Sequence, residues 1–353
     1  MKNVIAVHYF ERVESAKTPA DLFVDRESAR STYRRLARIV HPDANGGESR
    51  AVDAFAKLSM FWDQYNGKIT SPRVAAGPAN ASKGLIFESK RHTYFVGDLA
   101  KRTDFANIYP AEYIEDTHQR YAALKIPRSP KNNDLIENEV RALKTLKESV
   151  PERYQMFYPS TLDTFMHRDK TNGKQRRVIV TTALPGFVSL REVLDAYPQG
   201  INGRHIAWIT RRLFPALDQA HDAGITHGAV FPENVMIHPT DHSVVLINWA
   251  YSQPKDAQLK AAVPKYRDEG WYGLSLNKKL DHRLDIKLAA RTMEAMLGEQ
   301  SAKPFRAFFN GCKVASTPTA GELFLEFEEL LTRVYGERKY VPFEMPRGWK
   351  REA

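Results

Sequence analysis

A stretch with almost no large apolar residues, residues 69–84, divides the chain. It is rich in Pro, Gly, Ala and Ser, which is typical of linkers rather than of packed elements. Because such a segment cannot contribute much to a core, the chain must bury its apolar residues on either side of it. We therefore expect a small helical domain over residues 1–68, a linker over 69–86, a larger domain over 87–345 and a basic tail over 346–353.

The first part carries two amphipathic helical patterns separated by a short turn. Apolar residues recur at helical spacing over residues 28–40 and again over residues 51–65. Between them lies His41-Pro-Asp, followed closely by two glycines. Proline ends a helix and glycine lets the chain turn, so the pattern predicts an antiparallel helical hairpin.

The residues around this turn resemble a known family. Tyr33-Arg-Arg-Leu-Ala, followed by His41-Pro-Asp, resembles the J-domain of Hsp70 co-chaperones over about residues 18–66. In that family the His-Pro-Asp loop and the basic face of the preceding helix dock on Hsp70 and stimulate its ATP hydrolysis. The family's usual first-helix signature is absent, and residues 1–17 carry no assignment. The Hsp70-binding residues that the resemblance implies are His41, Pro42, Asp43, Arg34, Arg35 and Arg38.

Charge and cysteine content narrow the function classes. A single cysteine, Cys312, excludes an internal disulfide and a cysteine-rich zinc site. No apolar run approaches the length of a membrane span, so we expect no membrane partner, and the single cysteine favours a reducing cytoplasm. The net charge of +10 suits a nucleic acid, a membrane surface or an acidic partner, and does not choose among them. No helix-turn-helix, RNP or zinc signature accompanies the basic clusters, which makes nucleic acid the weaker alternative.

The second part carries short motifs in a fixed order. His227-Gly-Ala-Val-Phe-Pro-Glu-Asn234 resembles the catalytic loop His-Arg-Asp-x-Lys-Pro-x-Asn of protein kinases. Tyr121-Ala-Ala-Leu-Lys125 resembles the Val-Ala-Ile-Lys strand, and Glu139 falls where a helix supplies the partner of that lysine. The resemblance spans about residues 87–338 and implies an α+β fold with a β-rich N-lobe and a helical C-lobe. Further matches are Thr182 before the hinge, Asn248 where Asp-Phe-Gly begins, and Asp285 in a later helix.

Several positions depart from the kinase pattern. Ala229 stands where a catalytic Asp accepts a proton, and Phe231 stands where a lysine lies near the transferring phosphate. Asn248 replaces a metal-binding Asp, although hard cations favour carboxylates. The expected glycine-rich loop, residues 97–109, contains one glycine. The resemblance thus implies a pseudokinase with no catalytic residue, no metal site and no required cofactor, in which ATP with magnesium binds weakly at most.

The residues that survive from the kinase pattern are Lys125, Glu139 and Asn234. Together with Thr182 and Asn248 they form a vestigial nucleotide-binding set. For the lysine and glutamate, a structural ion pair that fixes the helix is a simpler interpretation than contact with the α- and β-phosphates. His227 is expected to be a buried structural histidine, and Asp285 to cap the catalytic-loop backbone. The expected core residues include Trp208, Phe214, Trp249 and Cys312.

Two functions follow. The main hypothesis is a J-domain co-chaperone that recruits an Hsp70, with the pseudokinase domain as a scaffold for a client or partner protein. The alternative is an atypical serine/threonine-kinase-like enzyme, which would use another carboxylate such as Glu233, or a nucleotide-binding regulator.

Overall fold

The chain divides into two compact units. The computed structural model describes residues 2–23, 26–45, 48–65, 85–115, 118–169, 173–273, 279, 281–298, 303–314 and 318–346. The first unit comprises Met1–Ala79 and Thr332–Pro342, and the second comprises Asn80–Leu331 and Phe343–Ala353. Most of the predicted linker and nearly all of the predicted basic tail lie outside the described residues.

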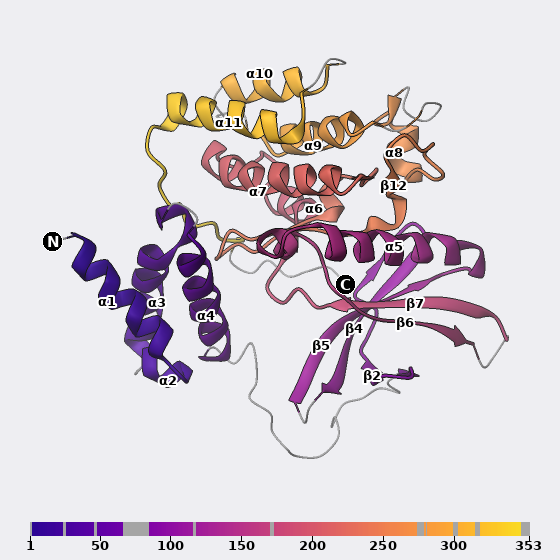
Figure 1. Cartoon of the computed structure of the whole chain (residues 1–353), viewed down its shortest axis with the longest axis horizontal. Helices are drawn as coiled ribbons and strands as arrows, with labels where there is room; N and C mark the ends of the chain where they lie inside the picture. The colour runs from indigo at the N-terminus through magenta and orange to yellow at the C-terminus, as the bar shows by residue number, and fades with distance from the viewer. Residues whose placement is uncertain are drawn as a thin grey trace. The chain divides into compact units, whose positions relative to one another are not determined.

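The first unit is helical (Figure 1). The hairpin predicted over residues 28–40 and 51–65 is present, and each helix begins two residues earlier than predicted. Asn45 closes the first of these helices, because its amide nitrogen donates to the carbonyls of Ile39 and His41 at 2.8 Å each. The elements are α1 Lys2–Ser15, α2 Pro19–Leu22, α3 Arg26–Val40, the 3-10 turn η1 Pro42–Asn45 and α4 Ser49–Tyr65.

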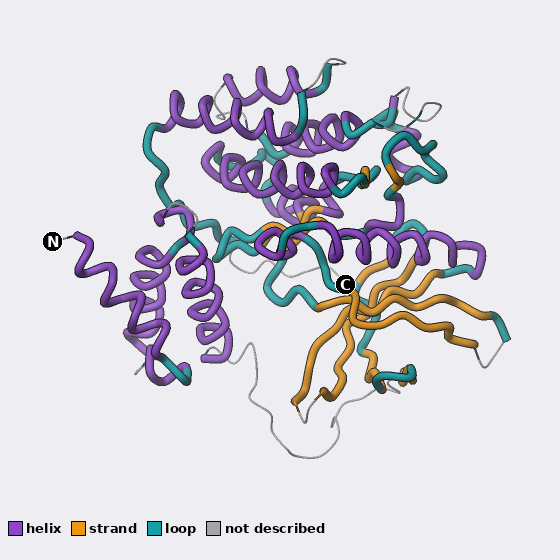
Figure 2. Tube along the Cα trace, viewed as in Figure 1, coloured by secondary structure: helices purple, strands orange, loops and turns teal. Residues whose placement is uncertain are grey.

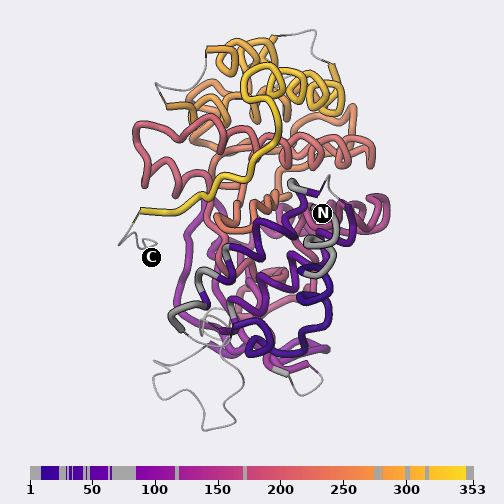
Figure 3. The backbone as a smooth tube through the Cα atoms, turned by 90° about the vertical axis from the view of Figure 1, so that its left-hand side faces the viewer, coloured from indigo at the N-terminus to yellow at the C-terminus, as the bar shows by residue number. Residues whose placement is uncertain are grey.

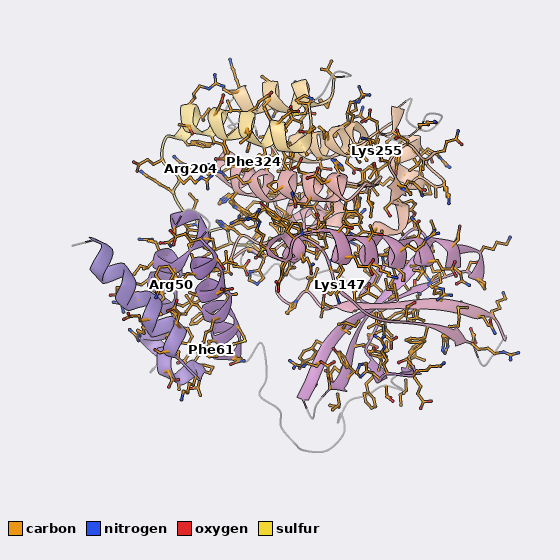
Figure 4. The ribbon with its side chains drawn as sticks, viewed as in Figure 1. Arg50, Phe61, Lys147, Arg204, Lys255 and Phe324 are labelled. Atoms are coloured by element: carbon orange, nitrogen blue, oxygen red, sulfur yellow. The ribbon has the colours of Figure 1, made fainter. Side chains whose placement is uncertain are left out.

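Apolar side chains from all four helices form one core in this unit. The ring of Tyr33 on α3 stacks on Trp62 of α4, with centroids 4.6 Å apart. Helix α1, which the sequence left unassigned, packs against α3 and α4. Arg50, labelled in Figure 4, pairs with Glu14 of α1 at 2.6 Å and ties the two helices together.

The second unit begins with a curled antiparallel sheet, in which the strand order is β1-β2-β4-β5-β7-β6 and β3 pairs with β4 (Figure 2). Alternate side chains point into the core, so that Tyr94, Leu124 and Val180 are fully buried. The strands are β1 Leu85–Glu88, β2 Thr93–Val96, β3 Lys101–Arg102, β4 Ala106–Glu115, β5 His118–Pro127, β6 Thr161–Arg168 and β7 Gln175–Thr182.

Helix α5, Asn133–Ser149, packs against β6 and β7 at the junction with the rest of this unit. The remaining helices gather beyond it, and the orange and yellow coils of residues 303–335 lie at the top of the view in Figure 3. They are α6 Leu190–Ala196, α7 Gly203–Asp222, α8 Pro264–Asp268, α9 Arg283–Ala295, α10 Lys303–Cys312 and α11 Ala320–Tyr335. This part of the unit also contains two small sheets. The first has three strands, β8 Val188–Ser189, β10 Val235–Ile237 and β11 Val244–Leu246, with β10 in the middle. The second pairs β9 Ile225–Thr226 with β12 Gln253–Pro254.

The predicted core residues of this unit are confirmed. Trp208, Phe214, Trp249 and Cys312 are all buried. Burial raises the pKa of the Cys312 thiol to about 12, so the group stays protonated and unreactive at neutral pH. None of the helices in the described part of the chain combines the length and the apolar character that crossing a membrane requires.

Candidate functional site

The lysine and glutamate that the sequence paired meet where β5 faces α5. The Lys125 ammonium lies 2.8 and 2.6 Å from the two carboxylate oxygens of Glu139. Both side chains are withdrawn from solvent, with exposed fractions of 11% and 3%. If either residue were removed, the charge of the other would stay buried without a partner, and its desolvation would not be offset. The pair holds α5 against the sheet.

Two asparagines continue the same chain of hydrogen bonds. Lys125 Nζ donates to Asn248 Oδ1 at 3.1 Å, and Asn248 Nδ2 donates to Asn234 Oδ1 at 3.2 Å. Asn234 Nδ2 then donates to the backbone carbonyl of Ala229 at 2.8 Å. Asn248 adopts a left-handed backbone, with φ 66° and ψ 58°, which asparagine tolerates better than most residues. Four of the five residues assigned to a nucleotide therefore form one network.

Thr182 lies outside this network, at the end of β7. Its backbone N–H donates to the Ser160 carbonyl at 3.0 Å, and its hydroxyl accepts from the Ser160 backbone N–H at 3.2 Å. These bonds join β7 to the loop that precedes β6. In this structure Thr182 therefore serves the sheet, next to the hinge where the sequence placed it.

The two asparagines do not fit a magnesium ion. A hard cation favours charged carboxylate oxygens, whereas both asparagines offer neutral amide oxygens. Asn248 Oδ1 already accepts from Lys125, and Asn234 Oδ1 already accepts from Asn248. Within the described ranges, no three His, Cys, Asp or Glu side chains are grouped to hold a metal. Hydrogen bonds between neutral amides stand where the kinase resemblance would place a metal-binding carboxylate.

Asp285 of α9 holds the loop that would carry the catalytic base. Its carboxylate accepts from the backbone N–H groups of His227 and Gly228 at 2.7 and 2.8 Å. His221 Nε2 lies 3.0 Å from the same carboxylate. Burial opposes ionisation, but the contacts with His221 and His227 keep the pKa of Asp285 below its ordinary value. The predicted role of Asp285 as a backbone cap is confirmed.

His227 is a buried structural residue, as the sequence indicated. Its Nε2 lies 3.0 Å from the Ile247 carbonyl, and its Nδ1 accepts from the Ala229 backbone N–H at 3.1 Å. Burial lowers the pKa of His227 to about 4, so the ring is neutral at pH 7. Both ring nitrogens are therefore engaged by the backbone. Ala229, at the position of the catalytic Asp, is fully buried and offers only a methyl group.

An aromatic cluster occupies the position of the catalytic-loop lysine. Phe231 is 1% exposed and stacks on Tyr266, with centroids 3.7 Å apart and planes 7° apart. The rings of Trp271 and Tyr272 meet it edge-on, each with centroids 5.7 Å away. A cation near a transferring phosphate is thereby replaced by a packed apolar surface.

Glu233, the carboxylate that an atypical kinase could use, is already engaged. Arg191 Nε donates to it at 3.2 Å, and the Tyr266 hydroxyl donates to its other oxygen. Burial alone would raise the pKa of Glu233, but the bond from Tyr266 and the charges of Arg191 and Lys265 lower it. A carboxylate whose pKa is lowered and whose two oxygens both accept hydrogen bonds is a poor general base.

The sequence did not single out Phe105, which lies in the loop between β3 and β4. Its side chain is 3% exposed, and its ring centroid lies 5.7 Å from Lys125 Nζ. The sequence signal that could have identified Phe105 is a large aromatic residue in a loop expected to be rich in glycine. The loop therefore places an apolar ring beside the lysine that would contact phosphate.

A separate cavity of about 800 Å³ lies against another part of α5, between that helix and β6. Lys144 and Lys147 line it, together with Arg91 and Phe165; Figure 4 labels Lys147 on α5. None of the five residues assigned to a nucleotide lines this cavity. The lysine site and the cavity are thus distinct features of the second unit.

In the first unit, the residues assigned to Hsp70 binding fall into two groups. Arg35 and Arg38 are exposed on α3, while His41 and Pro42 are buried. His41 packs against Phe55 and Tyr340, with ring centroids 4.7 Å apart in both cases. His41 is therefore a core residue in this structure, whereas the sequence placed it at a contact surface. The side chains of Arg34 and Asp43 lie outside the described residues.

The second unit is similar to kinases in both sequence and structure. The sequence model of the lipopolysaccharide kinase (Kdo/WaaP) family matches residues 128–265. Among solved structures, the crystal structure of the BubR1 kinase domain superposes with a TM-score of 0.52 at 12% sequence identity. That match covers 78% of this chain and 91% of the BubR1 chain. No curated protein matches the chain. The chain therefore contains a bilobal, protein-kinase-like domain.

Proposed function

We propose that this protein is a kinase-like regulator that does not transfer phosphate and that acts by binding. The observation that carries the proposal is the continuous network from Glu139 through Lys125, Asn248 and Asn234 to the Ala229 carbonyl. Phosphoryl transfer depends on a positioned base and on charge stabilisation by a cation. Here the base position is a methyl group, and the two oxygens that could face a cation belong to neutral amides that accept hydrogen bonds from Lys125 and Asn248.

This proposal follows the kinase-like alternative rather than the co-chaperone hypothesis, because both matches to known proteins involve the kinase-like part. The contacts of Glu233 favour the regulator over the atypical enzyme. Glu233 is held by Arg191 and Tyr266, so it is not available to replace the missing base. The network around Lys125 then serves to keep α5 in place.

A phosphotransfer assay tests the proposal. The full chain is incubated with γ-labelled ATP and either magnesium or manganese, with basic protein and small sugar acceptors, and transfer is compared with that of Lys125→Met. We expect both proteins to show the same background. Transfer by the natural chain that Lys125→Met abolishes would refute the proposal. Ala229→Asp with Asn248→Asp is the matched variant, because it returns both missing carboxylates and reports whether they alone limit the reaction.

Recruitment of an Hsp70 is a second candidate function, and the helical hairpin favours it. Helices α3 and α4 enclose His41-Pro-Asp, and Arg35 and Arg38 are exposed on α3 as the J-domain resemblance requires. A basic helix face suits an acidic partner surface and speeds its encounter. Because His41 packs on Phe55 and Tyr340, binding through His41 would require its ring to leave this core.

The test is the rate of ATP hydrolysis by a bacterial-type Hsp70 with and without the full chain. If the second function holds, the chain raises the rate and His41→Gln abolishes the effect. Since His41 is buried, Arg35→Glu with Arg38→Glu separates recognition from folding, because both arginines are exposed. Met60→Ala, at an exposed position of α4, is the control and should leave the rate unchanged. No stimulation by the natural chain would exclude this function.

A further inference from the structure

We infer that Phe105, Asp104 and Tyr251 form an aromatic latch that occupies the space beside Lys125 Nζ, where the kinase resemblance would place a phosphate, so that the site admits nucleoside in preference to nucleotide. This inference rests on the proposed function, since it assigns a ligand preference to the site of the non-transferring regulator. It begins from the mismatch between the residues present and a polyphosphate.

The strand register brings Phe105 to the lysine. Ile108 of β4 pairs with Lys125 of β5, and the Arg128 backbone N–H donates to the Phe105 carbonyl at 2.8 Å. The Phe105 ring therefore enters the space next to Lys125 Nζ, where its centroid lies 5.7 Å away. At 3% exposure the ring is packed inside the domain rather than swinging over its surface.

The lysine has no hydrogen-bond donor left for a phosphate. A lysine ammonium carries three N–H donors. Three acceptors lie within hydrogen-bond distance of Lys125 Nζ, namely both oxygens of Glu139 and Asn248 Oδ1, at 2.8, 2.6 and 3.1 Å. A phosphate would have to take one of these positions and also displace an apolar ring that cannot hydrogen-bond to it. Both changes oppose phosphate more than they oppose an uncharged nucleoside.

Tyr251 fastens the ring in this position. It lies in the 3-10 turn Trp249–Tyr251, just after Asn248, and its ring meets Phe105 edge-to-face with centroids 5.9 Å apart and planes at 88°. Its hydroxyl donates a hydrogen bond to the Asp104 carboxylate. Burial raises the pKa of Tyr251, so the hydroxyl remains a donor at neutral pH. One residue thus contacts the loop through both its ring and its hydroxyl.

The loop backbone is held independently of these side chains. The Thr103 N–H donates to the Ala106 carbonyl at 2.8 Å, and the Ala106 N–H donates to the Thr103 hydroxyl at 3.0 Å. Asn132 Nδ2 donates to the Phe105 carbonyl at 3.3 Å. Removing the Phe105 ring should therefore open space beside Lys125 without releasing the loop.

Titration calorimetry with adenosine and ADP, without magnesium, tests the latch on the full chain. If the closed state holds nine molecules in ten or more, it weakens ADP binding by about tenfold or more, and Phe105→Ala should recover that factor. Adenosine affinity should change by less than about threefold, because the nucleoside does not need the phosphate position. Phe105→Leu keeps an apolar side chain in place and is the matched control, expected to resemble the natural chain. Tyr251→Phe keeps the ring contact but loses the bond to Asp104, and should show a smaller gain for ADP than Phe105→Ala.

The outcomes separate the latch from the proposed function. Equal ADP affinity of the natural chain and Phe105→Ala would refute the latch and leave the regulator proposal intact, provided that thermal unfolding shows both proteins to be folded. A similar gain for adenosine and ADP would also refute it, because the ring would then oppose the nucleoside as much as its phosphates. Failure of Phe105→Ala to bind ADP at millimolar concentration would overturn the latch as well. Phosphate transfer by the natural chain would instead refute the proposed function.

Discussion

Replacing Lys125 by methionine should destabilise the kinase-like domain strongly. The substitution keeps most of the apolar stem but leaves the Glu139 carboxylate, 3% exposed, without its counter-charge. It also removes the donor to Asn248 Oδ1. Removing one partner of a buried ion pair costs about 3–5 kcal/mol, because the other charge remains desolvated and unpaired. We expect Lys125→Met to lower the free energy of unfolding by that amount.

The single variant Glu139→Leu and the double variant Lys125→Met with Glu139→Leu complete a cycle that isolates the pair. With both charges gone, the junction of β5 and α5 becomes apolar, and exchanges of this kind are often neutral or stabilising. The double variant should therefore recover most of the loss, leaving a coupling free energy of about 2 kcal/mol or more between the two positions.

Urea-induced unfolding at pH 7, followed by circular dichroism and fluorescence, measures these changes. Lys144→Met is the matched control, because Lys144 pairs with Glu148 at 3.9 Å with side-chain exposures of 71% and 63%. An exposed pair within one helix contributes about 0.3–0.5 kcal/mol, so this control should barely change the midpoint. If Lys125→Met costs no more than Lys144→Met, the pair does not hold α5 and the reasoning fails.

Three further predictions concern the same domain. Asp285→Ala leaves two buried N–H groups and His221 without their acceptor and should cost about 3–5 kcal/mol in urea unfolding at pH 7, whereas Asp285→Asn should cost less because one oxygen remains. Gly200→Ala should destabilise far more than Gly224→Ala in thermal melts, because both have positive φ but only the Gly200 Cβ would meet backbone, 2.3 Å from Gly298 N; equal losses would contradict this reasoning. Acidification from pH 6.5 towards pH 4 should progressively destabilise the domain, because its histidines are protonated in the unfolded state while buried histidines in the folded state stay neutral. Urea midpoints that stay constant over this range would contradict it. Burial lowers the pKa to about 4 at His205, His227 and His282.

Much of the candidate site could be predicted because its chemistry follows from residue type at a fixed spacing. The motifs placed Lys125, Glu139, Asn234 and Asn248 in one site, and these four residues share one hydrogen-bond network. The same local reasoning identified the cap formed by Asp285. Helix α1 was missed, because its apolar residues do not form a clear stripe along the helix. Its helical conformation is stabilised by packing on α3 and α4, which periodicity alone does not report.

The sequence by itself determined that the chain has a helical hairpin, a kinase-like α+β domain, and no residue at the base position that could accept a proton. Only the tertiary structure decided how the surviving polar groups are used. Phe105 and Tyr251 meet from distant parts of the chain, and the donors of Lys125 are shared between Glu139 on α5 and Asn248 beyond β11. The burial of His41 against Tyr340 is another contact between distant segments. Such contacts depend on strand register and on helix packing, which bring distant residues together, whereas periodicity and motif spacing report only on neighbours along the chain.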